Sequence, residues 1–258
     1  MQIKPIKHFG QNFLINKRAI SNVINGAKLL KTDIVLEIGP GKGALTKELV
    51  KRVKKVIAVE KDERLVKFLE QEFKNYENIK IIHGDILKNH ELGIKNHEYK
   101  IVANLPFYIT APVIRKFLEI ENPPKEMTLI VQKEVAQRIC AKPPRMSILA
   151  VSVQFYAEAK VLSYISKRSF KPVPKVDSAI IQITPKKKHD INPDKFFKIV
   201  KAGFSQPRKQ LINNLSKKLD IDKKELGSLL LSKRIKPTQR AETLSVENWL
   251  NLTKKGGL

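Results

Sequence analysis

Short β-branched segments alternate with amphipathic stretches along the first part of this 258-residue chain, and this alternation constrains its fold most strongly. Strand and helix patterns that alternate at this length are typical of βαβ units. They predict an α/β fold in which helices cover a parallel sheet. The predicted strands are 34–38, 56–60, 79–83, 100–103, 127–131 and 176–184, and the first predicted helices are 45–52 and 65–73.

The chain carries a large positive charge. It holds 50 Lys and Arg against 25 Asp and Glu, a formal net charge of +25. So much uncompensated charge favours a polyanionic partner. We therefore expect nucleic acid as the partner, with an anionic membrane surface as the alternative. Hydrophobic residues make up 42% of the chain, which is enough for a folded core.

The positive charge is denser toward the end of the chain. Residues 186–258 contain 18 Lys and Arg against 7 Asp and Glu. The change in density falls at Pro185-Lys186-Lys187-Lys188, where proline and like charges both oppose regular structure. This pattern predicts a first domain over 1–185 and a basic second domain over 186–258.

Cysteine usage and hydropathy bear on the compartment. The single cysteine, Cys140, cannot form an internal disulfide or a zinc cluster alone, so we expect a reducing compartment and no metal site. No apolar run approaches the ~18 residues of a membrane span. The first residues also lack the apolar core of a signal peptide. The sequence therefore predicts a cytoplasmic protein.

A glycine-rich loop follows the first predicted strand. It reads Glu37-Ile38-Gly39-Pro40-Gly41-Lys42-Gly43-Ala44, and the spacing Gly39-x-Gly41-x-x-Ala44 fits the dinucleotide-binding fingerprint. Ligands of open parallel sheets bind beyond the carboxyl ends of the strands, so this loop is a candidate cofactor site. A plain turn between a strand and a helix has similar glycines and stays an alternative.

Carboxylates at the strand ends distinguish two nucleoside cofactors. Glu60 ends the second strand, where it is placed to accept ribose hydroxyls, and Asp85 after the third strand suits an exocyclic amine. Pro40 lacks an N–H that a pyrophosphate would use. Three carboxylates, with Glu37 as the third, would repel a diphosphate and attract a cationic sulfonium. S-adenosylmethionine therefore fits better than NAD, although Glu37 and Asp85 would also suit helix caps or lysine pairs.

The turn after the fourth strand reads Asn104-Leu105-Pro106-Phe107. An adenine amino group is a poor nucleophile, and its reaction is favoured by acceptors aimed at the N–H groups where positive charge grows. The Asn104 side-chain oxygen and the Leu105 carbonyl are two such acceptors. Pro106 would stiffen the turn and Phe107 would stack on an extruded base. The alternative is a structural turn with Phe107 in the core.

At these residues the sequence resembles the ribosomal RNA small-subunit adenine dimethyltransferase family, which is similar in turn to the erythromycin-resistance methyltransferases of the large subunit. The resemblance runs almost end to end. Its motifs are Lys7-His8-Phe9-Gly10-Gln11-Asn12-Phe13-Leu14, Glu37-Ile38-Gly39-Pro40-Gly41-Lys42-Gly43, Val59-Glu60, Gly84-Asp85-Ile86, Asn104-Leu105-Pro106-Phe107-Tyr108, Gln132-Lys133-Glu134-Val135-Ala136, Phe170-Lys171-Pro172-Val173-Pro174-Lys175-Val176-Asp177-Ser178, Phe204-Ser205-Gln206-Pro207-Arg208-Lys209 and Arg240-Ala241-Glu242-Thr243-Leu244.

The resemblance implies a Rossmann-like S-adenosylmethionine-dependent methyltransferase domain and a small all-helical C-terminal domain. It implies N6,N6-dimethylation of two neighbouring adenosines near the 3′ end of small-subunit rRNA, in an assembling subunit. By themselves, Gln11 and Asn12 favour an N-cap role; the resemblance makes them cofactor contacts. The expected cofactor-binding residues are Gln11, Asn12, Leu14, Glu37, Gly39, Gly41, Glu60, Asp85, Ile86 and Asn104. The expected catalytic residues are Asn104, Leu105, Pro106 and Phe107.

RNA contacts are expected mainly from the basic tail. The candidate residues are Phe170, Arg208, Lys209, Arg234 and Lys236, and we expect a monomer. Between Arg138 and Ser147 the chain is shorter than the family pattern, which puts in doubt any RNA contact that this loop makes elsewhere. The competing functions are an RNA-binding assembly factor that uses the fold for docking, a large-subunit rRNA adenine methyltransferase and a DNA adenine methyltransferase. The sequence has no recognisable target-recognition domain for the last of these.

Overall fold

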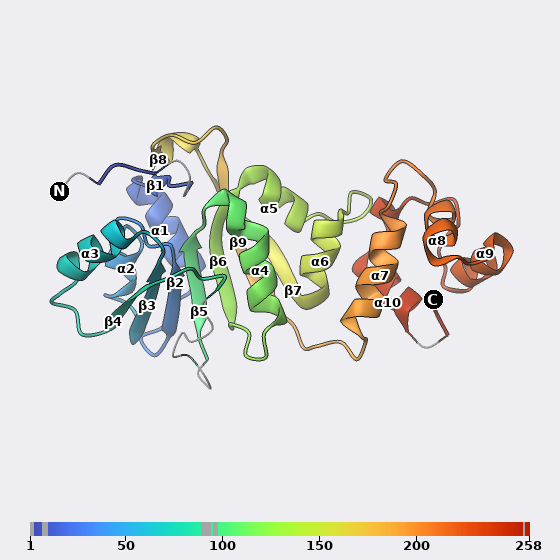
Figure 1. Ribbon diagram of the computed structural model, residues 1–258, viewed down its shortest axis with the longest axis horizontal. Helices are drawn as coiled ribbons and strands as arrows, with labels where there is room; N and C mark the ends of the chain where they lie inside the picture. The colour runs from blue at the N-terminus through green and yellow to red at the C-terminus, as the bar shows by residue number, and fades with distance from the viewer. Residues whose placement is uncertain (1–2, 7–9, 89–93, 95–97, 255) are drawn as a thin grey trace. The chain divides into compact units, whose positions relative to one another are not determined.

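The computed structural model describes residues 3–6, 10–88, 94, 98–254 and 256–258 (Figure 1). Lys7, His8 and Phe9 of the first motif lie outside the described residues. The chain forms two compact units, Met1–Ala136 with Ala157–Pro185, and Gln137–Tyr156 with Lys186–Leu258. Residues 137–156 therefore belong to the second unit, whereas the sequence-based division assigns them to the first domain. They do so because Met146, Val151 and Phe155 pack into the core of the second unit.

A seven-stranded sheet forms the centre of the first unit, with the strand order β4-β3-β2-β5-β6-β9-β7. The strands from β2 to β6 pair in parallel, whereas β9 pairs antiparallel with both β6 and β7. The strands of this sheet are β2 (Ile34–Ile38), β3 (Lys55–Glu60), β4 (Ile79–His83), β5 (Lys100–Asn104), β6 (Glu126–Gln132), β7 (Ala157–Ile165) and β9 (Ser178–Pro185). A separate two-stranded sheet pairs β1 (Phe13–Leu14) antiparallel with β8 (Phe170–Lys171).

The sequence-based strands agree with these elements. All six predicted strands are confirmed within two residues at each end, and the Rossmann-like α/β class is confirmed. The expected parallel sheet is correct for β2 to β6 only. Three strands, β1, β7 and β8, were not predicted. Two of them are two-residue pairings that no hydrophobic period reveals, and β7 is an edge strand with mixed burial.

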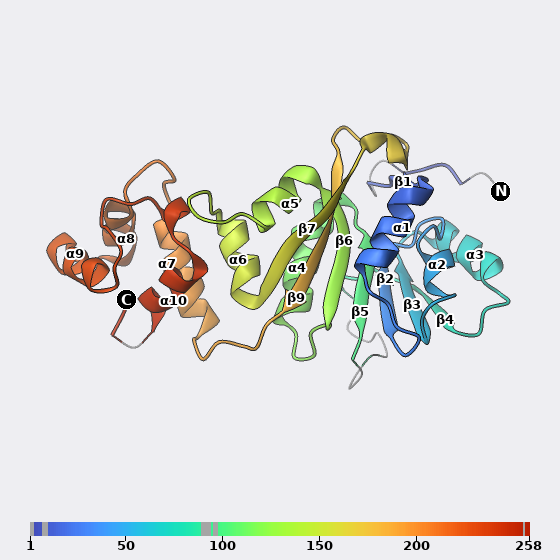
Figure 2. The same ribbon diagram turned by 180° about the vertical axis from the view of Figure 1, so that it is seen from behind.

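Helices cover both faces of the sheet. Figures 1 and 2 show α4 (Thr110–Glu119) in front of one face and α1 (Lys17–Gly26) in front of the other. Two of the helices begin at side-chain caps: at α1, Asn16 accepts from Ala19 N (2.9 Å), and at the helix that starts at Glu63, Asp62 accepts from Arg64 N (3.1 Å). The remaining helical elements of this unit are α2 (Thr46–Leu49), α3 (Glu63–Glu72), η2 (Phe107–Ile109), α5 (Lys133–Ile139, which ends in the second unit) and η3 (Lys167–Ser169).

The described residues of the second unit form helices around their own apolar core. Trp249 and Phe196 are fully buried at its centre. The elements are α6 (Ile148–Tyr156), α7 (Pro193–Gly203), α8 (Leu211–Leu219), α9 (Lys223–Ser232), η4 (Ala241–Thr243) and α10 (Val246–Thr253). In the part of the chain that the structure describes, every helix is too short or too polar to cross a membrane.

Candidate functional site

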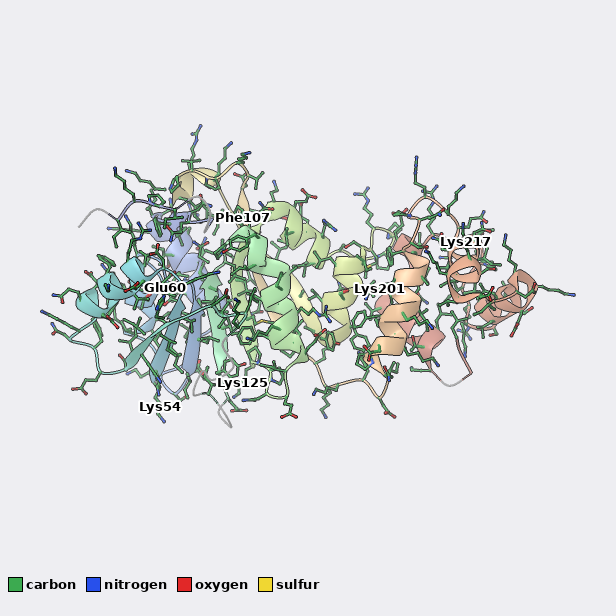
Figure 3. All side chains as sticks on the ribbon, in the orientation of Figure 1. Lys54, Glu60, Phe107, Lys125, Lys201 and Lys217 are labelled. Carbon is green, nitrogen blue, oxygen red and sulfur yellow. The ribbon has the colours of Figure 1, made fainter. Side chains whose placement is uncertain are left out.

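A pocket opens at the carboxyl edge of the parallel strands. The chain runs outward from β2 to β3 and β4 and returns to β5 on the other side of β2, so the strand order reverses beside β2. Ligands of open α/β sheets bind at such a reversal. Residues that line the pocket come from the ends of β2, β3, β4 and β5, from residues 10–14 and from Phe170. Figure 3 labels Glu60 at this edge and Lys54 near the opposite end of β3.

The pocket is an open cleft. Its empty volume of about 1200 Å³ includes space that is continuous with the solvent. A ligand can therefore enter it directly from solution.

The glycine loop takes backbone conformations that require glycine. Gly39, Gly41 and Gly43 have φ values of 66°, 59° and 76°, in the left-handed region. A Cβ on Gly41 would also lie 3.1 Å from the Phe13 ring. A plain turn between a strand and a helix would also explain these φ values. The loop is nevertheless part of the site, because Phe13 packs closely against it and Gly39 and Gly41 line the pocket.

Glu60 ties the glycine loop to the end of β3. Its Oε2 accepts from Gly41 N (3.1 Å), and its Oε1 accepts from Lys61 N (2.8 Å) and Asp62 N (3.0 Å). The side chain is only 7% exposed. Burial raises the pKa of Glu60, and the three N–H groups act against that rise. An ionised carboxylate has about four lone-pair sites, so Glu60 retains acceptor capacity beyond these three bonds.

Glu37 lies deeper than the sequence suggested. It is 1% exposed, and its Oε2 accepts from the Thr46 hydroxyl at 2.7 Å. Burial raises its pKa from 4.5 to about 8, and nearby Glu60 contributes to the rise. We expected Glu37 to be negatively charged. That expectation is wrong at neutral pH, because the buried carboxyl stays mostly protonated. Glu37 lines the inner wall of the pocket as a neutral polar group.

Asp85 stays ionised and forms an ion pair with a lysine. Lys61 Nζ lies 3.0 Å from Asp85 Oδ2, while Leu87 N donates to Oδ1 at 3.0 Å. Burial works to raise the pKa of Asp85, but these partners outweigh it and hold the pKa below its usual value. The pocket is therefore less negative than three free carboxylates would make it. The lysine pair and local cap considered as alternatives for Asp85 are both present, yet Asp85 also lines the pocket.

Residues 10–14, which we call the strap, cross the site from the N-terminal side. Gln11 Nε2 donates to Asp62 Oδ2 (2.9 Å), and Gln11 Oε1 accepts from Ile6 N (2.8 Å). Hydrogen bonds from Arg64 and Gln11 lower the pKa of Asp62 to about 2, so a charged acceptor anchors the strap. The N-cap role that the residues alone favour for Gln11 and Asn12 is wrong, because Asn16 caps the first helix.

Asn104 ends β5, and its side-chain orientation is fixed by the strap. Its Nδ2 donates to the Asn12 carbonyl at 3.0 Å, across 92 positions of sequence. Among the described residues, no donor contacts Asn104 Oδ1 or the carbonyl oxygen of Leu105. Phe107 is half-buried in the pocket wall, so the core placement considered for it is wrong. Two acceptors and an aromatic ring thus lie together beside the glycine loop.

The structure brings all the predicted cofactor and catalytic residues into one pocket, together with Phe170. It does not bring the other candidate RNA contacts there. Arg208, Lys209, Arg234 and Lys236 are exposed in the second unit.

Several residues of the site escaped sequence reasoning. Phe13, Lys42, Lys61 and Tyr108 line the pocket, and Lys42 Nζ lies 5.0 Å from the centre of the Phe13 ring. Phe13, Lys42 and Tyr108 lie inside quoted motifs and Lys61 follows Glu60, so position in or beside a motif was the available signal. Their contacts reach across the fold and leave no period in the sequence.

Over nearly its whole length, this chain is similar to one protein family and to named relatives. The family model described as ribosomal RNA adenine dimethylase matches residues 4–255. A protein named ribosomal RNA small subunit methyltransferase A, from Dehalococcoides mccartyi strain CBDB1, is 44% identical over 97% of this chain and 88% of its own length. A protein of that name from Fusobacterium nucleatum subsp. nucleatum is 41% identical and covers 98% of both chains.

Solved structures show the same architecture. A dimethyladenosine transferase from Plasmodium falciparum superposes with a TM-score of 0.82 at 27% identity, over 93% of this chain and 95% of its own. The 23S rRNA methyltransferase ErmE gives a TM-score of 0.77 at 26% identity, over 93% of this chain and 97% of its own.

Glu37 should make stability fall with rising pH. In the unfolded chain its carboxyl ionises near pH 4.5, whereas the folded chain holds the proton to about pH 8. The stabilisation is complete below pH 4.5 and is lost toward pH 8, by up to about 1.4 kcal/mol per pH unit. Urea unfolding at pH 5 to 8 measures this, with Glu37→Gln as the variant that cannot ionise. Wild-type stability should decline relative to the variant; parallel curves would show that Glu37 is already charged.

Proposed function

This chain belongs to the ribosomal RNA adenine dimethylase family, and we propose that it places four methyl groups on the N6 atoms of two adjacent adenosines near the 3′ end of small-subunit rRNA. The cofactor is S-adenosylmethionine, which supplies an electrophilic methyl group on a positively charged sulfur. One observation carries the catalytic part of the proposal. The bond from Asn104 Nδ2 to the Asn12 carbonyl leaves Oδ1 as the atom that can accept from a substrate amine.

The residues of the pocket fit this cofactor. A buried carboxylate with spare acceptor capacity, Glu60, suits ribose hydroxyls, and the Asp85 turn suits an exocyclic amine. Glycine at position 41 lets the loop pack closely against the Phe13 ring, since a Cβ there would lie only 3.1 Å from it. We assign the cofactor to Gln11, Asn12, Leu14, Glu37, Gly39, Gly41, Glu60, Asp85, Ile86 and Asn104, all of which line the pocket. Glu37 acts there as a neutral group.

The target adenine would lie against the Asn104–Phe107 turn. Its amino N–H groups donate to Asn104 Oδ1 and to the Leu105 carbonyl, which turns the nitrogen lone pair out of conjugation with the ring. As the nitrogen takes the methyl group and the methyl–sulfur bond breaks, the nitrogen becomes positive and its two N–H protons become acidic. The two acceptors stabilise this developing charge until one proton is released to water. Pro106 stiffens the turn, and Phe107 stacks on the base. Pro106 O accepts from Ile109 N at 3.1 Å, which closes the turn into η2.

The relatives favour the small subunit over the large one. Proteins named ribosomal RNA small subunit methyltransferase A are 41–44% identical to this chain, whereas the 23S rRNA methyltransferase ErmE is 26% identical. A DNA substrate and a docking role without catalysis have no comparable support. We further propose that the chain acts as a monomer, in the cytoplasm, on a small subunit that is still assembling.

Mass spectrometry of rRNA nucleosides tests the function. Small and large subunits from cells that lack the protein would be incubated with it and with isotopically labelled S-adenosylmethionine. We expect labelled N6,N6-dimethyladenosine at two adjacent positions near the 3′ end of small-subunit rRNA. Label confined to large-subunit rRNA, or absent from both, would contradict the proposal.

Removal of the Asn104 acceptor should slow chemistry more than binding. We expect Asn104→Ala to lower the single-turnover rate of methyl transfer by about 100- to 1000-fold, since one preorganised polar group is lost. RNA affinity should stay within about twofold, because phosphate contacts supply most of that affinity. Asn104→Asp is the comparison variant, which keeps an acceptor oxygen but loses the donor to Asn12 and adds a negative charge. A loss below tenfold for Asn104→Ala would assign the chemistry elsewhere.

Four exposed basic residues of the second unit lie on two chain segments that meet. Backbone bonds from Leu211 N to Gln239 O (2.6 Å) and from Ile212 N to Pro237 O (3.2 Å) join the two segments that carry them. We define the basic patch as Arg208, Lys209, Arg234 and Lys236. Exposed cations in one place suit a phosphate backbone, and we propose that the patch binds rRNA. Phe170, the fifth candidate RNA contact, is buried and lines the pocket instead.

Neutralising the basic patch should flatten the salt dependence of RNA binding. Each phosphate contact contributes about −0.7 to −0.9 to the slope of log affinity against log salt. If each of the four residues contacts one phosphate, alanine at all four positions should reduce the magnitude of the slope by about 3. The matched control replaces four exposed lysines at the edge of the sheet opposite the pocket: Lys31, Lys54 and Lys74, which precede strands, and Lys55, which begins β3. Equal slopes for the two quadruple variants would show that the patch is not an RNA surface.

A further inference from the structure

A lysine outside every motif grips the turn that follows β4. Lys116 lies on α4, and its Nζ donates to the carbonyl oxygens of Ile86 (2.7 Å) and Leu87 (3.2 Å). The side chain is half-buried. Burial lowers the pKa of Lys116, and the nearby charge of Asp85 acts against that change. Moving an ammonium group out of water costs free energy. The two hydrogen bonds to the carbonyl oxygens offset this desolvation cost.

Hydrogen bonds hold the turn over residues 84–88, part of which lines the pocket. Gly84 N donates to Glu60 O (2.9 Å), Lys88 N to Asp85 O (2.9 Å) and Leu87 N to Asp85 Oδ1 (3.0 Å). Lys116 satisfies the next two carbonyls along the chain. The turn lines the pocket from Gly84 to Leu87, and the Asp85 side chain, which also pairs with Lys61, is its charged group there.

The helix that carries Lys116 begins at the proposed target-base turn. Asn104 ends β5, η2 spans Phe107–Ile109, and α4 starts at Thr110. Lys116 lies six residues further along that helix. It therefore fastens the turn assigned to the cofactor to the helix that follows the segment assigned to the adenine substrate.

We propose that Lys116 is a positioning residue for the cofactor, which holds the Asp85–Leu87 turn in the shape that recognises the adenine 6-amino group. This inference rests on the proposed function, because it assumes that the turn contacts the cofactor. If Lys116 only fastened the helix to the turn, its replacement would lower stability and leave the preference of the site for adenine over other nucleobases unchanged. If Lys116 is a positioning residue, its replacement weakens that preference, because a displaced Asp85 accepts less well from the amine.

The test compares S-adenosylhomocysteine with S-inosylhomocysteine, in which an oxygen replaces the 6-amino group. Calorimetric titration of the full chain should show that Lys116→Met weakens binding of the adenine compound about tenfold, as expected when a charged donor is lost from the supporting turn. Binding of the inosine compound should change by less than twofold. Lys116→Arg, which keeps two donors, should restore most of the preference.

Arg115→Met is the matched control, because Arg115 is an exposed cation of the same helix that pairs with Glu119 (2.9 Å) away from the turn. It should leave both affinities unchanged. If Lys116→Met does not fold, Lys116→Gln and Lys116→Arg carry the comparison. A folded variant with an unaltered preference for the adenine compound would overturn the inference. Failure of the wild-type chain to bind S-adenosylhomocysteine would instead contradict the proposed function.

Discussion

The parallel pairing of β2 with both β3 and β5 is the constraint on which the site depends. Because β2 is an interior strand, the chain must leave it toward β3 and β4 and return to β5 on the other side. All these strands point the same way, so their carboxyl ends meet at one edge. Each end carries a residue of the site: Glu37, Glu60 and Asn104 end their strands or lie one residue before the end, and Asp85 follows two residues after β4.

The carboxylates of the pocket act mainly on the protein backbone. Glu60 binds the N–H groups of Gly41, Lys61 and Asp62, and Asp85 binds that of Leu87. Glu37 is buried and mostly protonated at neutral pH. These bonds fix the glycine loop and the turn after β4 before any ligand arrives. Preorganisation of this kind lowers the cost of ordering the site on binding.

Sequence reasoning succeeded where a signal is local and failed where a contact spans the fold. Buried strands such as Ile34–Ile38 have a short apolar pattern, and strand order then follows from chain direction and connection rules. The bond between Asn104 and Asn12 joins positions 92 residues apart, and Lys116 meets Ile86 across 30. Nothing in either neighbourhood marks these pairings. Charge counting failed for Glu37 because burial, which the sequence does not display, decides its protonation.

The central claim is that the strap orients Asn104 so that its oxygen faces the target amine. The most direct measurement is a crystal structure of the protein with S-adenosylhomocysteine and an adenosine bound together. We predict that the adenosine N6 lies within hydrogen-bond distance of both Asn104 Oδ1 and the Leu105 carbonyl. Asn104 Nδ2 should still donate to the Asn12 carbonyl. An adenosine bound with its N6 directed away from this turn, or an Asn104 amide released from Asn12, would contradict it.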